Sequence, residues 1–221
     1  MGSGLTVLVV LNGDIDSKFL AQQLATADRV VAADGGAGAV TAAGGICDVI
    51  VGDGDSLDEE GFAQARAANP DVEIRRFPAA KDATDAELAL RTALEADPER
   101  IVVVGAFGGA RLDHELATVM LLANPRWRDR DVVLADGRRE VRLVTDRTEI
   151  HGRAGDFVTL LAVGGPVGNL HSNGLRYELA DHGLEVGTSL GVSNELAKSR
   201  ASLEVGSGLL LVVHEHGSGG N

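Results

Sequence analysis

Two aspartates, Asp53 and Asp55, directly follow the apolar triplet Val49-Ile50-Val51 and Gly52 in the sequence. The triplet predicts a short buried strand, and residues two apart in an extended segment point to the same side. Both carboxylates can therefore point to one position just beyond the end of the strand. No Lys or Arg lies within five residues, and two unpaired carboxylates repel each other, so the pair favours a divalent cation such as Mg²⁺. The alternative is that Asp55 or Ser56 only caps the following helix.

A second segment, Asp34-Gly35-Gly36, lies between a predicted strand (30–33) and a short helix of small residues. Glycines at such a position let a phosphate or a sugar approach the backbone, and the N–H groups of the helix favour anions. A tight turn that needs a positive φ explains the same glycines equally well.

Two further polar segments precede predicted helices. In the first, Thr84 is the expected N-cap and Asp85 a first-turn carboxylate, while Lys81 could offer its charge to a phosphate. In the second, Arg111 and His114 form a basic pair beside Asp113, which could itself only cap its helix. An acidic protein needs such local cations to hold an anion.

Strands and helices alternate about six times over residues 1–135, and the predicted strands are strongly apolar, as in 5–11 and 101–104. This alternation predicts a doubly wound, mostly parallel sheet with helices on both faces. Ligands of such sheets bind beyond the carboxyl ends of the strands. All four polar segments lie there, which makes this edge of the sheet the candidate site.

The pattern changes after about residue 136 to short alternating runs separated by glycine turns. We expect strands at 140–145, 157–163, 167–171, 175–179, 201–205 and 209–214. The prediction is therefore an α/β domain over residues 1–138, followed by an all-β domain over 139–221, a sandwich or small barrel.

Composition indicates which partners and which cellular compartment to expect. The formal net charge of −13 in 221 residues argues against nucleic acid or an anionic membrane as partner. Cys47 is the only cysteine, which excludes an internal disulfide and is consistent with a reducing compartment. We see neither a signal peptide nor an apolar run near the ~20 residues of a membrane span. These features predict a soluble, cytoplasmic protein.

The sequence resembles the thiamine pyrophosphokinase family. The similar stretches are DGGA (34–37), DVIVGDGDSL (48–57), KDATDAELAL (81–90), GGARLDH (108–114), NGLRYEL (173–179) and GVSNE (191–195). Their order and spacing agree over nearly the whole chain. Two departures are Gly54, where the family usually has a bulky residue, and Ala110, which has no counterpart in the family's pattern.

The resemblance implies an ATP-binding α/β domain, a thiamine-binding β-sandwich and a homodimer whose sites are shared between chains. Asp53, Asp55 and Asp85 would hold Mg²⁺ against the ATP phosphates, with Lys81 and Asp82 completing the acidic edge. Arg111 and the 105–109 loop, which contains Gly108, would face the nucleotide. Ser193 and Asn194 would contact the aminopyrimidine of thiamine, with Tyr177 nearby.

The implied reaction transfers the pyrophosphoryl group of ATP to the hydroxyl of thiamine, which gives thiamine diphosphate and AMP. Such a transfer needs mainly alignment and neutralised phosphate charge. The sequence leaves open whether Asp55 or Asp82 is the base. Two alternatives are a kinase for another small alcohol and a non-catalytic nucleotide sensor of the same fold.

Overall fold

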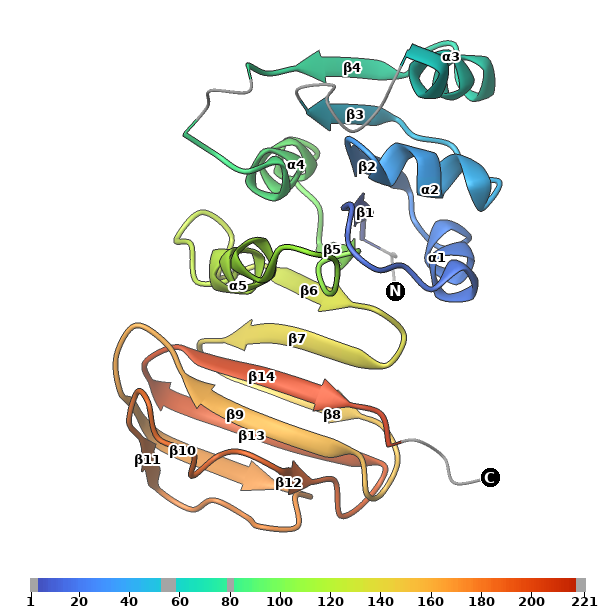
Figure 1. Ribbon diagram of the computed structural model, residues 1–221. Coiled ribbons are helices and arrows are strands. Elements are labelled where there is room, and N and C mark those ends of the chain that lie inside the picture. The colour runs from blue at the N-terminus through green and yellow to red at the C-terminus, as the bar shows by residue number, and fades with distance from the viewer. Residues whose placement is uncertain (1–3, 53–58, 79–81, 218–221) are drawn as a thin grey trace. The chain divides into compact units, whose positions relative to one another are not determined.

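The computed structural model describes residues 4–52, 59–78 and 82–217 (Figure 1). The chain divides into two compact units. The first comprises Met1–Leu121 with Arg130–Gly137, and the second comprises Leu122–Asp129 with Arg138–Asn221. The predicted fold class, an α/β part followed by an all-β part, is confirmed.

The first unit is built on a parallel sheet in the strand order β6-β5-β1-β2-β3-β4. Its strands are β1 (Thr6–Val10), β2 (Arg29–Ala33), β3 (Val49–Gly52), β4 (Glu73–Arg76), β5 (Arg100–Val104) and β6 (Asp131–Ala135). The chain adds strands on one side of β1 as far as β4 and then crosses to the other side for β5 and β6. The sheet is therefore doubly wound, as predicted.

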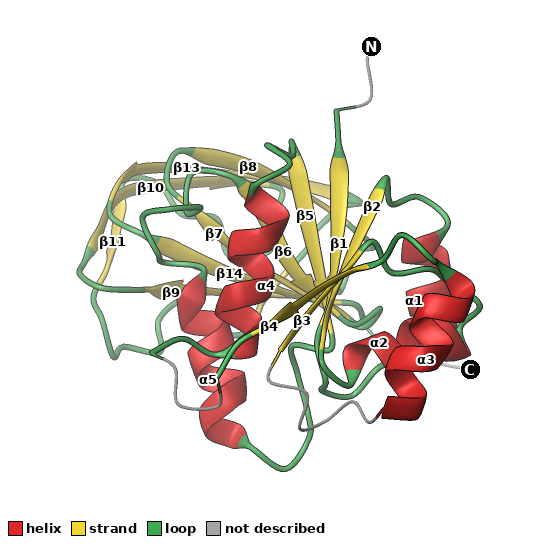
Figure 2. Ribbon diagram, turned by 90° about the horizontal axis from the view of Figure 1, so that it is seen from above, coloured by secondary structure: helices red, strands yellow, loops and turns green. Residues whose placement is uncertain are grey.

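Helices cover both faces of this sheet. They are α1 (Ser17–Leu24), α2 (Gly36–Ala42), α3 (Glu59–Ala68), α4 (Asp85–Leu94) and α5 (Leu112–Leu121). Figure 2 shows α1, α2 and α3 on one face and α4 and α5 on the other. Asp16 caps α1, since its side chain accepts a hydrogen bond from the N–H of Phe19 at 2.8 Å.

Burial explains the apolar character of the central strands. Val7, Val9, Val31, Val49 and Val51 are completely buried. Successive residues of a strand face opposite sides of the sheet, so a strand covered on both sides must be apolar at every position. The helices on the two faces provide that cover.

The second unit contains two antiparallel arrays of strands, β12-β9-β14-β7 and β11-β10-β13-β8. Their bounds are β7 (Arg139–Val144), β8 (Arg147–His151), β9 (Phe157–Ala162), β10 (Val167–Asn173), β11 (His182–Leu184), β12 (Asn194–Glu195), β13 (Arg200–Ser207) and β14 (Leu210–Glu215). Alternate residues from both arrays form one apolar core, for example Ala201, Leu203 and Val205 on β13. This is the layering of a β-sandwich.

The predicted strand at 175–179 is wrong. Apart from one bridge between Leu175 and Leu196, this segment forms no ladder. Side chains accept from two of its backbone N–H groups: Tyr177 N–H donates to Asn194 Oδ1 at 3.0 Å, and Leu179 N–H donates to Ser172 Oγ at 2.7 Å. The described residues also contain three strands that were not predicted, β8, β11 and β12.

Within the described residues, no helix is both long enough and apolar enough to cross a membrane.

The rate at which the buried Cys47 thiol is alkylated tests the packing of the first unit. Burial, and secondarily the adjacent Asp48 carboxylate, raises the pKa of the Cys47 thiol to about 12. The thiolate is the reactive form, and an unfolded cysteine has a pKa of about 8.5. We expect iodoacetamide at pH 8 to alkylate the native chain at least ~10²-fold more slowly than the urea-unfolded chain. Mass spectrometry would follow this single site, and equal rates would contradict the described packing.

Candidate active site

A cavity of about 380 Å³ lies at the carboxyl ends of β1, β2 and β5, within the first unit. Its lining comes from the loops after these strands and from the first turns of α4 and α5. The lining residues are Leu11, Asn12, Gly13, Ala33, Asp34, Thr84, Asp85, Ala86, Gly105, Ala106, Gly108, Gly109, Ala110, Arg111, His114, Glu115 and Thr118. This is the edge of the sheet at which the sequence predicted a site.

The cavity lies at the point where the order of the strands reverses. The connection from β1 leads to β2 on one side, while β5 lies on the other side of β1. The chain after β1 and the chain after β5 therefore lead to opposite sides of the sheet order. A crevice forms at the ends of the two strands, where these connections part. Open α/β sheets commonly bind their ligands in such a crevice.

The two loops that form this crevice are joined through their backbones. The N–H of Gly13 donates to the carbonyl of Gly105 at 2.9 Å, and the N–H of Asp14 donates to the carbonyl of Phe107 at 2.8 Å. A Cβ on Gly13 would lie 2.5 Å from both carbonyl oxygens. Only glycine permits this approach, so the shape of the cavity depends on it.

Asp34 contributes a buried carboxyl group from the end of β2. Only 5 % of the residue is exposed, and its φ of +42° is uncommon for a non-glycine residue. Gly52, at the end of β3, leaves room for it, since a Cβ there would lie 1.8 Å from Asp34 Oδ1. A buried polar residue in a strained backbone conformation is typical of a functional position.

Thr84 and Asp85 bring the amino end of α4 to the cavity. The Thr84 hydroxyl accepts a hydrogen bond from the N–H of Glu87 at 3.3 Å and so caps the helix. Asp85 lies in the first turn, where the helix dipole favours a negative charge. Thr84 and Asp85 therefore stabilise the start of α4 and also line the cavity.

The loop before α5 contributes the cavity's basic group. The Arg111 guanidinium donates to both oxygens of Asp113, at 2.8 and 2.6 Å. This contact holds the pKa of Asp113 well below its usual range and raises that of Arg111. The Gly108 N–H donates to Glu115 Oε2 at 3.1 Å, which ties the loop to the helix.

The structure brings together six of the predicted nucleotide-side residues: Asp34, Thr84, Asp85, Gly108, Arg111 and His114 all line the cavity. Four others lie outside its lining. Gly35 and Gly36 follow Asp34 at the start of α2, Asp82 is exposed, and Asp113 binds Arg111. Asp53, Asp55 and Lys81 lie outside the described residues.

Asn12, Gly13, Glu115 and Thr118 also line the cavity but were not predicted as site residues. The Asn12-Gly13 pair interrupts the chain directly after an apolar strand, a signal that could have found it. Glu115 follows His114 in the helix, four residues after Arg111. Its carboxylate accepts the hydrogen bond from the Gly108 N–H and so supports the loop that lines the cavity.

The predicted thiamine-side residues lie in the second unit. Asn194 is buried, and its side-chain amide forms two hydrogen bonds with the backbone of Tyr177. Oδ1 accepts from the Tyr177 N–H at 3.0 Å, and Nδ2 donates to the Tyr177 carbonyl at 2.7 Å. Tyr177 is 61 % exposed, with the Arg176 guanidinium 5.6 Å from the centre of its ring. Ser193 has a φ of +61°, and its N–H donates to Thr159 Oγ1 at 3.2 Å. Asn194 therefore positions the segment that presents Tyr177.

Comparison with known proteins matches both units in order. Residues 20–134 match the family described as "Thiamin pyrophosphokinase, catalytic domain", and residues 143–210 match "Thiamin pyrophosphokinase, vitamin B1 binding domain". The chain belongs to the thiamin pyrophosphokinase family. A curated relative from Bacillus subtilis, named thiamine pyrophosphokinase, is 28 % identical over 166 residues, which cover 73 % of this chain and 75 % of the relative.

Solved structures of the family agree with this assignment. The crystal structure of thiamine pyrophosphokinase from Bacillus subtilis is 26 % identical, with a TM-score of 0.83 over 96 % of this chain and 99 % of the other. The enzyme from Geobacillus thermodenitrificans is also 26 % identical, with a TM-score of 0.83 over 97 % and 99 % of the two chains. The yeast enzyme, at 17 % identity and a TM-score of 0.74 over 97 % and 87 %, shares the fold.

A pair of adjacent glycines tests whether the loop shapes the cavity. Gly108 and Gly109 have similar φ values, +75° and +82°, so alanine should cost each about 1 kcal/mol in backbone strain. A Cβ on Gly108 would lie 2.8 Å or less from three Asp14 side-chain atoms, whereas one on Gly109 meets nothing within 4 Å. We expect Gly108→Ala to lower the free energy of unfolding in urea by roughly 1–3 kcal/mol more than the control Gly109→Ala. Equal losses would contradict this packing.

Proposed function

We propose that this chain transfers the pyrophosphoryl group of ATP to the hydroxyl of thiamine and so forms thiamine diphosphate and AMP. The observation that carries the proposal is the cavity at the strand reversal, in which Asp34, Asp85 and Arg111 come together. It lies in the unit that matches the family's catalytic domain. The cytoplasmic location expected from the sequence is part of the same proposal.

On the nucleotide side, the site must hold three phosphates in a protein of net charge −13. We assign the amino end of α4 to the phosphates, because the N–H groups of a first turn offer donors at the positive end of the helix dipole. The loops after β1 and β5 would enclose the nucleotide. Arg111, more than half exposed and held by Asp113, contributes a preoriented cation.

The residues of the cavity fit a bound Mg²⁺ because carboxylate oxygens are its preferred ligands. We assign Asp85 to the ion together with Asp53 and Asp55. When bound, Mg²⁺ neutralises phosphate charge and so favours attack at phosphorus. Either Asp55 or Asp82 acts as the general base that takes the proton of the thiamine hydroxyl. Asp82 is exposed.

On the acceptor side, we assign Tyr177, Ser193 and Asn194 to thiamine. The amide of Asn194 is already bound to the Tyr177 backbone on both sides. Its contribution is therefore in large part to hold Tyr177 and Ser193 in place. Exposed Tyr177 offers an aromatic face to the charged thiazolium ring.

We further propose a homodimer in which each site combines the α/β unit of one chain with the β unit of its partner. Helix α5 supports a protein partner, because Leu112, Leu116 and Met120 recur every four residues along it and are 54–67 % exposed. Residues four apart form one face of a helix, so these side chains make a continuous apolar stripe. A two-fold interface is the commonest arrangement for such surfaces.

The test of the activity is incubation with ATP, Mg²⁺ and thiamine, followed by chromatography for AMP and thiamine diphosphate. Stoichiometric formation of both products supports the proposal. Formation of ADP and thiamine monophosphate would identify a simple kinase instead. Binding of ATP without turnover, with thiamine or with another small alcohol, would favour the nucleotide sensor.

Arg111 and Arg100 form a matched pair of variants. Both are partly exposed and ion-paired, Arg111 with Asp113 and Arg100 with Asp131 at 2.9 Å, but Arg100 begins β5 at the end of the strand away from the cavity. We expect Arg111→Met to lower kcat/KM for ATP by ~10-fold or more, since a charge-assisted contact is worth about 1.5–3 kcal/mol. Arg100→Met should leave it unchanged. Equal effects would remove Arg111 from the nucleotide site.

Mixing two inactive variants tests the shared site. After joint refolding of Asp85→Asn chains with Ser193→Ala/Asn194→Ala chains, half of randomly paired dimers are mixed and each mixed dimer has one intact site. We expect about a quarter of the wild-type activity to return. The control is each variant refolded alone. If subunit exchange is demonstrated but no activity returns, each site lies within a single chain.

A further inference from the structure

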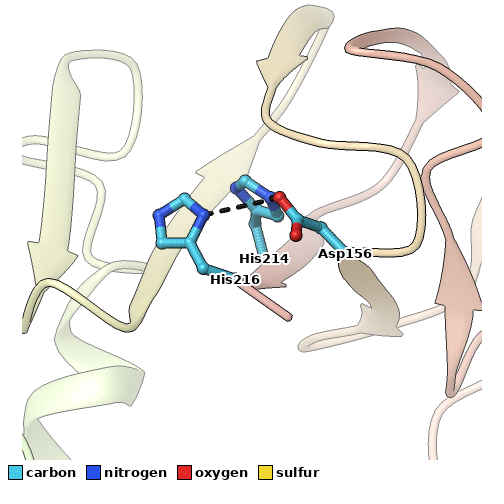
Figure 3. A group of neighbouring side chains, drawn as sticks. All are labelled: Asp156, His214 and His216. Atoms are coloured by element: carbon cyan, nitrogen blue, oxygen red, sulfur yellow. Dashed lines mark hydrogen bonds and ion pairs between the residues drawn. The ribbon is translucent and has the colours of Figure 1, made fainter. Parts of the chain in front are cut away.

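A cluster of one carboxylate and two imidazoles lies in the second unit, outside the proposed active site. Asp156 immediately precedes β9, His214 is on β14, and His216 follows the end of that strand. Residues two apart in an extended segment point to the same side. Figure 3 shows both rings and the carboxylate directed toward one another.

The spacing of the three groups is that of ligands around one ion. Asp156 Oδ2 lies 3.2 Å from His214 Nε2 and 3.5 Å from His216 Nδ1, and the three ligand atoms all lie within 4.8 Å of one another. Ligand atoms about 2.0–2.1 Å from a tetrahedral zinc ion are separated by about 3.3–3.4 Å. Charge-assisted hydrogen bonds, by contrast, are typically about 2.7–2.9 Å. Both contacts are longer than that and close to the edge of the tetrahedron.

The carboxylate is also held in place by the backbone. The N–H of Arg153 donates to Asp156 Oδ2 and the N–H of Gly217 to Oδ1, both at 2.8 Å. A Cβ on Gly152 would lie 2.5 Å from Oδ2 and 2.8 Å from His214 Nε2. The cluster is therefore packed against a glycine, and backbone hydrogen bonds orient its carboxylate, as they do in metal sites with a supporting outer shell.

The hydrogen bonds to Asp156 also act on its charge. Burial alone would raise the pKa of Asp156, but the N–H groups of Arg153 and Gly217 and the two histidines outweigh it and lower the pKa to about 2.

We propose that Asp156, His214 and His216 bind a divalent transition-metal cation, for which Zn²⁺ is the best match. Two imidazoles and one carboxylate are zinc ligands, whereas Mg²⁺ and Ca²⁺ take sets of oxygen ligands. Asp156 and His214 are almost completely buried, and His216 is 42 % exposed and lines a cavity of about 220 Å³. A water or a small anion completes the coordination from that cavity.

The role that follows is structural. The ion joins the segment before β9 to β14 and to the chain that follows it, 58 residues apart in the sequence. This metal is distinct from the Mg²⁺ of the proposed reaction, and the inference does not depend on that reaction.

The experiment uses the full chain without an affinity tag, stripped with chelator and placed in excess Mg²⁺ to occupy oxygen-only sites. Titration with Co²⁺ as the spectroscopic probe should show one saturable equivalent, with visible absorption of a four-coordinate site, and Zn²⁺ should displace it. Zn²⁺ should also raise the Tm of the wild-type chain.

His216→Ala is the decisive variant, because His216 is partly exposed and its loss should leave the fold intact. We expect it to weaken Co²⁺ binding at least ~10²-fold and to abolish the Zn²⁺-dependent rise in Tm. The matched control is His151→Ala, an exposed histidine 3.3 Å from Glu149 in the same unit, which should bind like the wild type.

Three outcomes would overturn the proposal. They are the absence of saturable Co²⁺ binding by the wild type, binding that survives in His216→Ala, and an equal loss in His151→Ala. If the three groups only form a hydrogen-bonded network, His216→Ala will lower the Tm by the same amount with chelator and with Zn²⁺, and the wild type will bind no metal.

Discussion

The close approach of two loops determines the candidate site of the first unit. Gly13 and Asp14, after β1, donate to carbonyls of the loop after β5, and no side chain fits at Gly13. Because β1 and β5 are neighbours whose connections lead to opposite sides, the crevice between these loops follows from the strand order. The two strands are paired in parallel from Thr6 with Arg100 to Val10 with Val104, so they end side by side. The shape of the cavity is thus set by contacts between backbone atoms, and these contacts position the side chains that line it.

The sequence predicted those features that are encoded locally. The continuous apolar runs predicted the parallel strands, and Thr84 as the expected N-cap predicted the start of α4, because each signal depends on residues within one or two turns. The same reasoning failed for 175–179, whose alternation is typical of a strand. There the side chains of Ser172 and Asn194 bind the backbone N–H groups, and no local pattern reveals that competition.

Contacts between distant residues were the least predictable part of the site. Gly52 makes room for Asp34, and the Gly13 N–H donates to the carbonyl of Gly105, because elements separated in the chain converge at one edge of the sheet. The three-residue group around Asp156 was missed for the same reason: its carboxylate and imidazoles are 58 and 60 residues apart. Knowing the residue types was insufficient where the fold itself brings distant side chains together.

The two candidate cation sites differ in the chemistry of their ligands, and this difference separates their roles. The cavity of the first unit offers carboxylates, which suit a hard cation that exchanges with its phosphate ligands. The group in the second unit offers two imidazoles and a backbone-held carboxylate, which suit a softer cation bound more permanently. A cation that must arrive and leave with a substrate gains from weak, partly hydrated coordination, whereas one that fastens a strand to a distant segment gains from a preformed set of ligands. The two proposed sites therefore differ in the class of cation that their ligands favour.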